Sequence, residues 1–218
     1  MIANRDAILD ILRERICLIP PNQQVVLKEK ELADEFGLSR TPIRQVLQKL
    51  ASEGMVVVRP GVGTVTTTVD GKDMTRYLTV LQLVLQTIAE FTQGQTPSAQ
   101  VALELAATRR FIERIDQPSV ETFIRLSTKI AAARASAVGD SVLATAYSSA
   151  FWRVVRWRAY EMSIDMEANW PTFVQRIEKI TSPECLKSTP LLFGASVAFV
   201  DLYKQKIASN PSGTAPQH

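Results

Sequence analysis

The chain has 218 residues, of which 46% are hydrophobic and 22% are charged, and its formal net charge is +3. This length and composition suit one large core or two modest ones, and we expect two domains. The small net charge excludes proteins that bind nucleic acid through an overall excess of positive charge, so any such binding must depend on a local patch. The first residues lack a secretory signal pattern, and no apolar run reaches the ~20 residues of a membrane span. We therefore expect a cytoplasmic protein that does not interact with membranes.

Few residues of the chain are suited to catalysis or metal binding. The two cysteines, Cys17 and Cys185, each lie in an apolar helical pattern far from any CxxC spacing, which predicts buried thiols in a reducing compartment. The only histidine is His218. The sequence also lacks a nucleophile elbow, a phosphate-binding loop and a recognisable pair of carboxylates, so we expect neither an enzyme nor a bound cofactor.

The first third of the chain begins with two helical patterns. Apolar residues recur at helical spacing over residues 4–19, with charged residues between them, which predicts an amphipathic helix. Two prolines end this helix, the short run 25–27 favours a small strand, and a second helical pattern covers residues 29–36. We therefore expect two helices joined by a turn and a short strand.

A tight turn and a hairpin follow. Gly37 stands where the end of a helix needs a positive φ, and Ser39 stands where the next helix needs an N-cap. The pattern then predicts a third helix over residues 40–53. Two β-branched runs, 55–59 and 64–69, flank a Pro/Gly turn, which is typical of a β-hairpin. Three helices followed by a hairpin predict a winged helix-turn-helix.

The third helix has an outward face that is polar and positive. Its apolar residues form one buried stripe, which leaves these side chains pointing outward: Arg40, Thr41, Arg44, Gln45 and Gln48. No acidic residue occurs from Phe36 to Ser52, although the chain carries 22. Arg40 and Arg44 are one turn apart, so both guanidinium groups can enter a DNA major groove and pair with guanine edges or phosphates.

Other residues of this region suit contacts with the DNA backbone and the minor groove. Lys30, near the start of the second helix, and the backbone amide of Ser39 are placed to bind phosphates, which fixes register without reading sequence. Arg59 lies beside a turn whose residues Gly61 and Gly63 have no side-chain bulk. This turn could approach the minor groove.

An alternative interpretation is that Arg40 and Arg44 form only the solvated face of a surface helix, and that the glycines serve only turn geometry. An isolated charged stripe favours this alternative. Here, however, the turn, the N-cap, the wing and the absence of acidic residues occur together. We therefore interpret residues 1–69 as a DNA-binding domain.

Beyond residues 70–73, which we interpret as a linker, strand patterns disappear, and glycines and prolines separate long helical patterns. We expect helices over residues 73–93, 97–115, 118–138, 141–168, 170–181 and 188–208. Residues 74–208 therefore predict an all-α helical bundle for ligand binding and dimerisation. The small polar residues 209–218 predict a flexible tail. The fold class is mainly α.

One predicted helix of the bundle suggests where a ligand could bind. Trp152, Arg156 and Tyr160 recur at four-residue spacing and so share a face, on which Arg156 could pair with an acidic ligand. The alternative is core or dimer packing with the arginines extended towards solvent. The apolar stretches 78–85 and 191–200 could wall a pocket for a lipophilic ligand, or could be plain core.

The N-terminal third resembles the GntR-type regulators. Four stretches carry the similarity: LKEKELA at 27–33, LSRTPIR at 38–44, LQKLASEG at 47–54 and, in the family's wing, RPGVGTV at 59–65. Position by position, the resemblance implies that Lys30, Arg40 and Arg44 contact DNA, with Gly61 at the tip of the wing.

The helical remainder resembles, by its layout, the FadR-like (FCD) effector domain. Many such domains hold a metal ion with an aspartate and three histidines. Here Val120 and Ile124 stand where the first aspartate and histidine would fall, and the only histidine is His218. Because imidazole ligands are missing, we expect no metal in this domain. Gln82 and Gln86 also stand where the family often has an Arg and a Glu.

Together these patterns favour a homodimeric transcription regulator, which we expect to be a repressor. It would bind a short pseudo-palindromic operator in double-stranded DNA and respond to an acidic or lipophilic small-molecule effector. The alternative function is a dimeric interaction scaffold of the same fold without specific operator binding.

Overall fold

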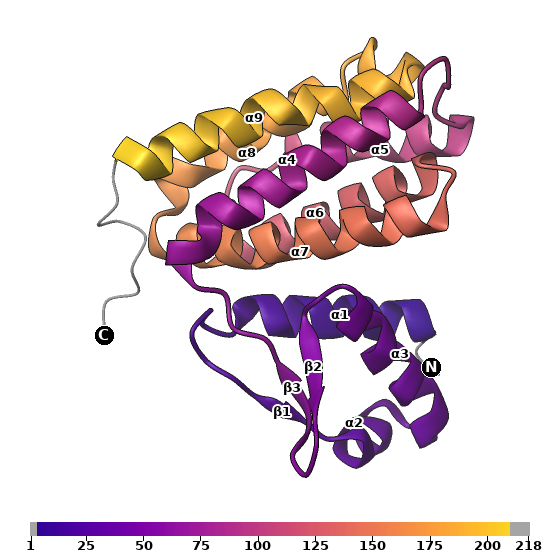
Figure 1. Cartoon of the computed structure of the whole chain (residues 1–218), viewed down its shortest axis with the longest axis vertical. Helices are drawn as coiled ribbons and strands as arrows, with labels where there is room; N and C mark the ends of the chain where they lie inside the picture. The colour runs from indigo at the N-terminus through magenta and orange to yellow at the C-terminus, as the bar shows by residue number, and fades with distance from the viewer. Residues whose placement is uncertain (1–3, 210–218) are drawn as a thin grey trace.

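The computed structural model describes residues 4–209 as two stacked layers (Figure 1). The winged helix-turn-helix and the all-helical remainder that the sequence predicts are both present, and the fold is mainly α as expected. His218 and all of the predicted tail except Ser209 lie outside the described residues. Within residues 4–209, no helix is long and apolar enough to cross a membrane.

The lower layer is the winged helix-turn-helix. Its elements are α1 (Arg5–Leu18), β1 (Val26–Leu27), α2 (Glu29–Phe36), α3 (Arg40–Ser52), β2 (Val56–Arg59) and β3 (Gly63–Thr66). The three strands form an antiparallel sheet in the order β1-β3-β2, with Val26 opposite Val65 and Val57 also opposite Val65. The sheet is therefore small, and it supports a hairpin that projects from the helices.

The turn between α2 and α3 has the conformation that the sequence predicts. Gly37 has φ 65°, in the left-handed region, and its amide donates to the carbonyl of Ala33. The amide of Leu38 donates to the same carbonyl at 3.0 Å. These bonds satisfy groups that the end of α2 would otherwise leave without partners, and they turn the chain sharply into α3.

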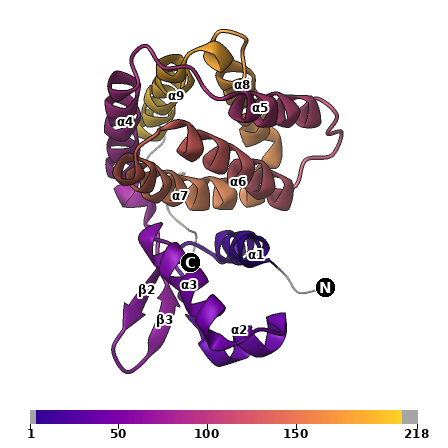
Figure 2. The ribbon, with the colours of Figure 1, turned by 90° about the vertical axis from the view of Figure 1, so that its right-hand side faces the viewer.

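The upper layer contains the remaining helices. They are η1 (Gly71–Asp73), α4 (Met74–Phe91), α5 (Ala99–Ile112), α6 (Val120–Ala137), α7 (Ser141–Ile164), α8 (Met166–Ile180), η2 (Cys185–Lys187) and α9 (Thr189–Ser209). Long helices pack side by side, α4 against both α9 and α7, and α6 against α7. In Figures 1 and 2, α6 and α7 form the side of the bundle that faces α1. Cys17 and Cys185 are both buried and unpaired.

The boundary between α7 and α8 lies earlier than the sequence predicts. We expected helices over 141–168 and 170–181, separated near Pro171, but the chain breaks at Asp165 and Pro171 lies inside α8. The Asp165 side chain caps α8 by accepting from the amide of Ala168 at 2.9 Å. The Asn169 side chain donates to the carbonyl of Asp165 at 2.7 Å. Side-chain capping at the new boundary thus outweighs the local signal of the proline.

The predicted linker is structured. Asp70 accepts a hydrogen bond from the amide of Lys72 at 2.9 Å, and this cap begins η1, which leads directly into α4. Val69 and Gly71, on either side of Asp70, are both buried. The chain therefore passes from one layer to the other through a capped turn packed against its neighbours.

Candidate DNA-binding surface

α3 presents the face that a DNA-reading helix needs. Its apolar residues Ile43, Val46, Leu47 and Leu50 are buried, with at most 3% of their surface exposed. All five residues expected to point outward are exposed: Arg40, Thr41, Arg44, Gln45 and Gln48. The helix is therefore fixed by one stripe while the opposite stripe meets solvent.

Ser39 precedes α3 in the extended conformation of an N-cap, with φ −73° and ψ 166°, but its side chain makes no capping hydrogen bond. The part of the prediction that assigned it a capping position is confirmed, whereas a side-chain cap is not formed. The first amides of α3 consequently keep donor capacity at the positive end of the helix dipole. Such amides suit a phosphate oxygen.

Arg44 is held by an acidic residue that the sequence pattern did not reveal. Its Nε and Nη2 atoms donate to the two carboxylate oxygens of Glu29, on α2, at 3.1 and 2.9 Å. The hydrogen bond from Arg44 lowers the pKa of Glu29, and the bond to Glu29 raises the pKa of Arg44. Glu29 lies outside the stretch of sequence that lacks acidic residues. The turn at Gly37 brings α2 beside α3, so only the tertiary structure reveals the pair of Glu29 and Arg44.

The other predicted contact residues of the helices differ in their surroundings. Gln45 accepts a hydrogen bond from Arg5, on α1, at 3.3 Å. Lys30 is exposed on α2. Within residues 4–209, neither Lys30 nor Arg40 forms an ion pair, so both cations are available to an external anion. The structure thus brings Arg40, Arg44 and Lys30 to the surface of two adjacent helices.

The hairpin between β2 and β3 carries the predicted wing residues. Arg59, Gly61 and Gly63 are exposed, and the two glycines have φ 76° and 110°. A Cβ atom added to either glycine would meet nothing within 4 Å, so glycine is needed there for backbone conformation and not for space. Val62 at the tip is 55% exposed. Figure 1 places this tip and α2 at the end of the molecule away from the bundle.

Two of the three predicted effector residues contact the winged helix-turn-helix. Arg156 is buried, and its Nη1 atom donates to the carbonyl oxygen and the hydroxyl of Thr67, just after β3, at 2.6 and 2.9 Å. Trp152 is also buried, and the Arg13 guanidinium of α1 lies 5.1 Å from its ring centroid. Tyr160 is half-buried beside Trp157. Arg156 and Trp152 thus pack against the winged helix-turn-helix, as the core-packing alternative expects, and the assignment of the three residues to an effector site stays a prediction.

The cavity of the bundle lies on another side of α7. It is lined there by Phe151, Val154, Val155 and Arg158, and none of the three expected residues lines it. Residues 78–85 and 191–200 contribute to both core and cavity, since Leu78, Leu81, Leu85, Ser196, Phe199 and Val200 line it. The two interpretations left open for these stretches therefore both apply.

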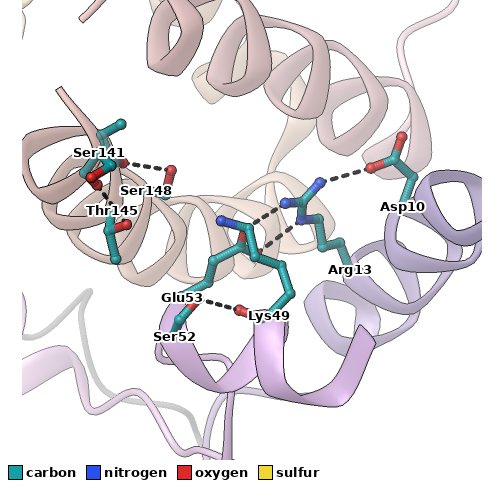
Figure 3. Close-up of polar contacts among 9 residues, drawn as sticks. Asp10, Arg13, Lys49, Ser52, Glu53, Ser141, Thr145 and Ser148 are labelled. Atoms are coloured by element: carbon teal, nitrogen blue, oxygen red, sulfur yellow. Dashed lines mark hydrogen bonds and ion pairs between the residues drawn. The ribbon is translucent and has the colours of Figure 1, made fainter. Parts of the chain in front are cut away.

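A second polar contact joins the helices beneath α7. Arg13 of α1 lies between Asp10 on its own helix and Glu53 at the end of α3, as Figure 3 shows. Its Nε atom is 3.0 Å from Glu53 Oε2, and Glu53 is only 1% exposed. Burial disfavours the charged form of Arg13, but its hydrogen bond to Glu53 and the charge of Glu53 raise its pKa overall. This pair fixes α1 to the end of α3.

Comparison with known proteins supports this geometry. Residues 4–65 match the family described as bacterial regulatory proteins, gntR family. An uncharacterised HTH-type transcriptional regulator from an unstable DNA locus of Streptomyces ambofaciens is 40% identical over 67 residues, which is 31% of this chain. The matched segment spans 28% of that relative's length.

Two solved structures share the fold of almost the whole chain. A GntR protein of Rhodococcus sp. RHA1 has a TM-score of 0.59 and 14% identity, covering 94% of this chain and 97% of that one. E. coli McbR/YncC has a TM-score of 0.59 and 14% identity, covering 97% and 100%. At this identity the likeness concerns the fold alone. The match to the family described as bacterial regulatory proteins, gntR family, thus coincides with the winged helix-turn-helix at residues 4–65.

Proposed function

We propose that the protein is a homodimeric, sequence-specific transcription regulator, and that its normal action is repression. Residues 1–69 bind the operator, residues 70–73 connect the two units, and residues 74–208 pair the subunits and bind a small-molecule effector. The observation that carries this proposal is the exposed face of α3, on which Arg40 and Arg44 stand one turn apart inside a gntR-family domain.

The residues of the surface have separate roles in the proposal. Arg40 and Arg44 enter the major groove and read base edges, helped by Thr41, Gln45 and Gln48. Lys30 and the amide of Ser39 bind phosphates, and Arg59, Gly61 and Gly63 bring the wing towards the minor groove. Glu29 orients the Arg44 guanidinium before DNA arrives, because it holds two of its nitrogens.

A two-fold dimer would present one α3 to each half of a palindromic operator. Recognition helices of such dimers bind half-sites whose centres are about 34 Å apart, one turn of DNA. The resemblance of the helical unit's sequence layout to the FadR-like effector domains supports assigning dimerisation to it. An effector then acts by changing the spacing or orientation of the two α3 helices.

The contacts between the two layers supply a route for this control. On one face of α7, Arg156 and Trp152 contact the winged helix-turn-helix. On another face, Phe151 and Arg158 line the cavity of the bundle. A ligand that displaces α7 therefore changes the support of the DNA-binding domain. The alternative function, an interaction scaffold without operator binding, requires that the α3 face has no preference among DNA sequences.

The experiment that tests the proposal is selection of genomic DNA fragments by the purified protein, followed by fluorescence anisotropy on the enriched sequence and on a scrambled duplex at physiological salt. We expect the wild-type protein to enrich a short palindrome and the Arg40→Ala/Arg44→Ala double variant to lose that preference. A matched control is Arg110→Ala/Arg114→Ala, two exposed arginines near the end of α5 and in the turn after it, which removes the same charge outside the winged helix-turn-helix. Wild-type protein that is dimeric and folded but shows no preference would support the scaffold.

A further inference from the structure

The helical unit contains a cavity whose charge is unbalanced. Its volume is about 260 Å³, and four of its lining residues are basic: Arg134, Arg158, Arg176 and Lys206. No acidic residue is among the described residues that line it. Buried charges in proteins are normally paired or hydrogen-bonded, because removing an ion from water is costly. A cavity lined in this way needs an anion from outside.

Two of the four basic groups lack an acidic partner, and of these Arg134 is buried whereas Arg176 is half-buried. Arg134, on α6, is 1% exposed, and its one hydrogen bond joins Nη2 to the carbonyl oxygen of Leu192 at 3.2 Å, while Nε has no partner. Arg176, on α8, has no hydrogen bond or ion pair within residues 4–209. Its pKa falls to about 10 because of burial and then because of the nearby charge of Arg134.

Each of these guanidinium groups lies over two aromatic rings. The Arg134 Cζ atom lies 4.6 Å from the ring centroid of Phe193 and 5.2 Å from that of Tyr147. The Arg176 Cζ atom lies 5.5 Å from the centroid of Phe173 and 5.7 Å from that of Phe151. Cation–π contacts of this kind involve the π-face of the ring, so the N–H groups stay available for hydrogen bonds.

The other two basic groups already have partners. Arg158 is 2.7 Å from Glu161 and also donates to Asn169, and Lys206 donates to Asn169 at 3.0 Å. Lys206 and Leu202 are exposed, as are Thr172 and Gln175 on α8, so the opening of the cavity lies between α8 and α9. An anion can therefore enter past Lys206 and reach the unpaired groups further in.

Most of the other lining residues are apolar, and they limit the size of the ligand's apolar part. Side chains of four helices contribute, namely Leu78, Leu81, Phe123, Phe173, Phe199 and Val200. A cavity of ~150 Å³ lined by such residues is large enough for benzene. The volume here thus suits one ring or a short alkyl chain together with a charged head group.

We propose that this cavity binds a small organic acid, with its carboxylate between Arg134 and Arg176 and its apolar body against the leucine and phenylalanine side chains. Carboxylates suit the planar fork of arginine, which donates two parallel hydrogen bonds. No metal ion is required, since the two guanidinium groups supply the positive charge. That this acid is the effector of DNA binding rests on the proposed function.

The test uses the full-length protein and a panel of monocarboxylates, from butanoate to octanoate with benzoate and phenylacetate, against the matched alcohols and amides. We expect at least one acid to bind in calorimetry and to raise Tm, while its uncharged counterpart does not. Equal binding of acid and amide, or no binding of any acid at millimolar concentration, would overturn the proposal. Chloride or inorganic phosphate binding as tightly as the best acid would also overturn it.

Two variants locate the site. Arg176→Met should weaken acid binding at least tenfold and, by removing a charge without a partner, raise the Tm of the ligand-free protein by about 2–4 °C. A lower Tm would show that the charge is a structural element and would contradict the proposal. Arg156→Met removes a buried arginine of α7 that does not line the cavity and should leave acid binding unchanged. Loss of binding in Arg156→Met alone would move the site to the other face of α7.

Operator binding separates this inference from the proposed function. Arg176→Met without ligand should bind the operator as the wild type does, and the acid should change operator affinity only in the wild type. If the protein binds acids through Arg176 but no operator is found, the cavity assignment stands and the regulatory function fails. If the protein binds the operator but binds no acid, the regulatory function stands and the cavity assignment fails.

Discussion

The two layers of the molecule use arginine in opposite ways. On α3 of the winged helix-turn-helix, Arg40 and Arg44 are exposed, so water solvates them until another anion arrives. In the bundle, Arg134 and Arg156 are at most 3% exposed and are surrounded by rings and backbone. An exposed cation costs little to maintain, whereas a buried one must be compensated. This difference is why we propose a site on the surface of the first layer and a site in the interior of the second.

The buried ion pair between α1 and the end of α3, within the first layer, gives the largest expected effect. Arg13→Ala leaves the Glu53 carboxylate buried, with Lys49 at 3.7 Å as its remaining cation. We expect the free energy of unfolding to fall by about 3 kcal/mol, measured by urea denaturation. Arg15→Ala removes a neighbouring arginine of α1 whose pair with Glu35 is exposed, and should cost at most about 1 kcal/mol. Equal losses in the two variants would contradict the role of burial.

The next effect sharpens the assignment of roles on the surface of the first layer. Arg44→Ala should weaken operator binding about tenfold or more and relax the preference among bases, because a bidentate contact to a base edge is lost. Lys30→Ala should instead weaken binding to all sequences and reduce the slope of log affinity against log salt by about 1. Fluorescence anisotropy on operator and scrambled DNA measures both. An equal loss on both duplexes in Arg44→Ala would rule out its reading of bases.

A smaller effect compares one glycine from each layer. Gly37 and Gly194 both have space for a Cβ atom, but Gly37 has φ 65° whereas Gly194 lies in helical backbone of α9. Alanine at position 37 should therefore lower the free energy of unfolding by about 1–2 kcal/mol. Alanine at position 194 should raise it by up to about 1 kcal/mol through helix propensity. Changes of the same sign in urea denaturation would mean that contacts, and not backbone conformation, decide both sites.

The smallest effect concerns the acidic partner of Arg44. The hydrogen bond from Arg44 lowers the pKa of Glu29 below its usual 4.5, so the carboxylate is ionised throughout the neutral range and the pair is lost only in acid. Glu29→Gln removes a negative charge from the surface and should tighten binding to any DNA severalfold at low salt. If Glu29 also orients Arg44, the ratio of operator to scrambled affinity should fall. An unchanged ratio would limit Glu29 to a general electrostatic role.

The sequence predicted the first layer better than the second because its signals are local. A glycine after α2 and β-branched runs around a Pro/Gly turn each fix the backbone within a few residues. In the second layer, the boundary at Asp165 depended on capping by Asp165 and Asn169 from both sides of the break. Pro171 alone led to the wrong boundary between the two helices. A proline restricts the backbone of its own position, whereas the capping hydrogen bonds at Asp165 set where α7 ends and α8 begins.

The sequence by itself determined which side chains share a helix face: Arg40 with Arg44, and Trp152 with Arg156. Helical periodicity fixes this relation regardless of the rest of the chain. Only the tertiary structure decided what each face meets. It placed Glu29 against Arg44, turned Arg156 towards Thr67, and brought Arg134 of α6 and Arg176 of α8 to one cavity. These residues lie far apart in the sequence, and the packing of whole helices brings them together.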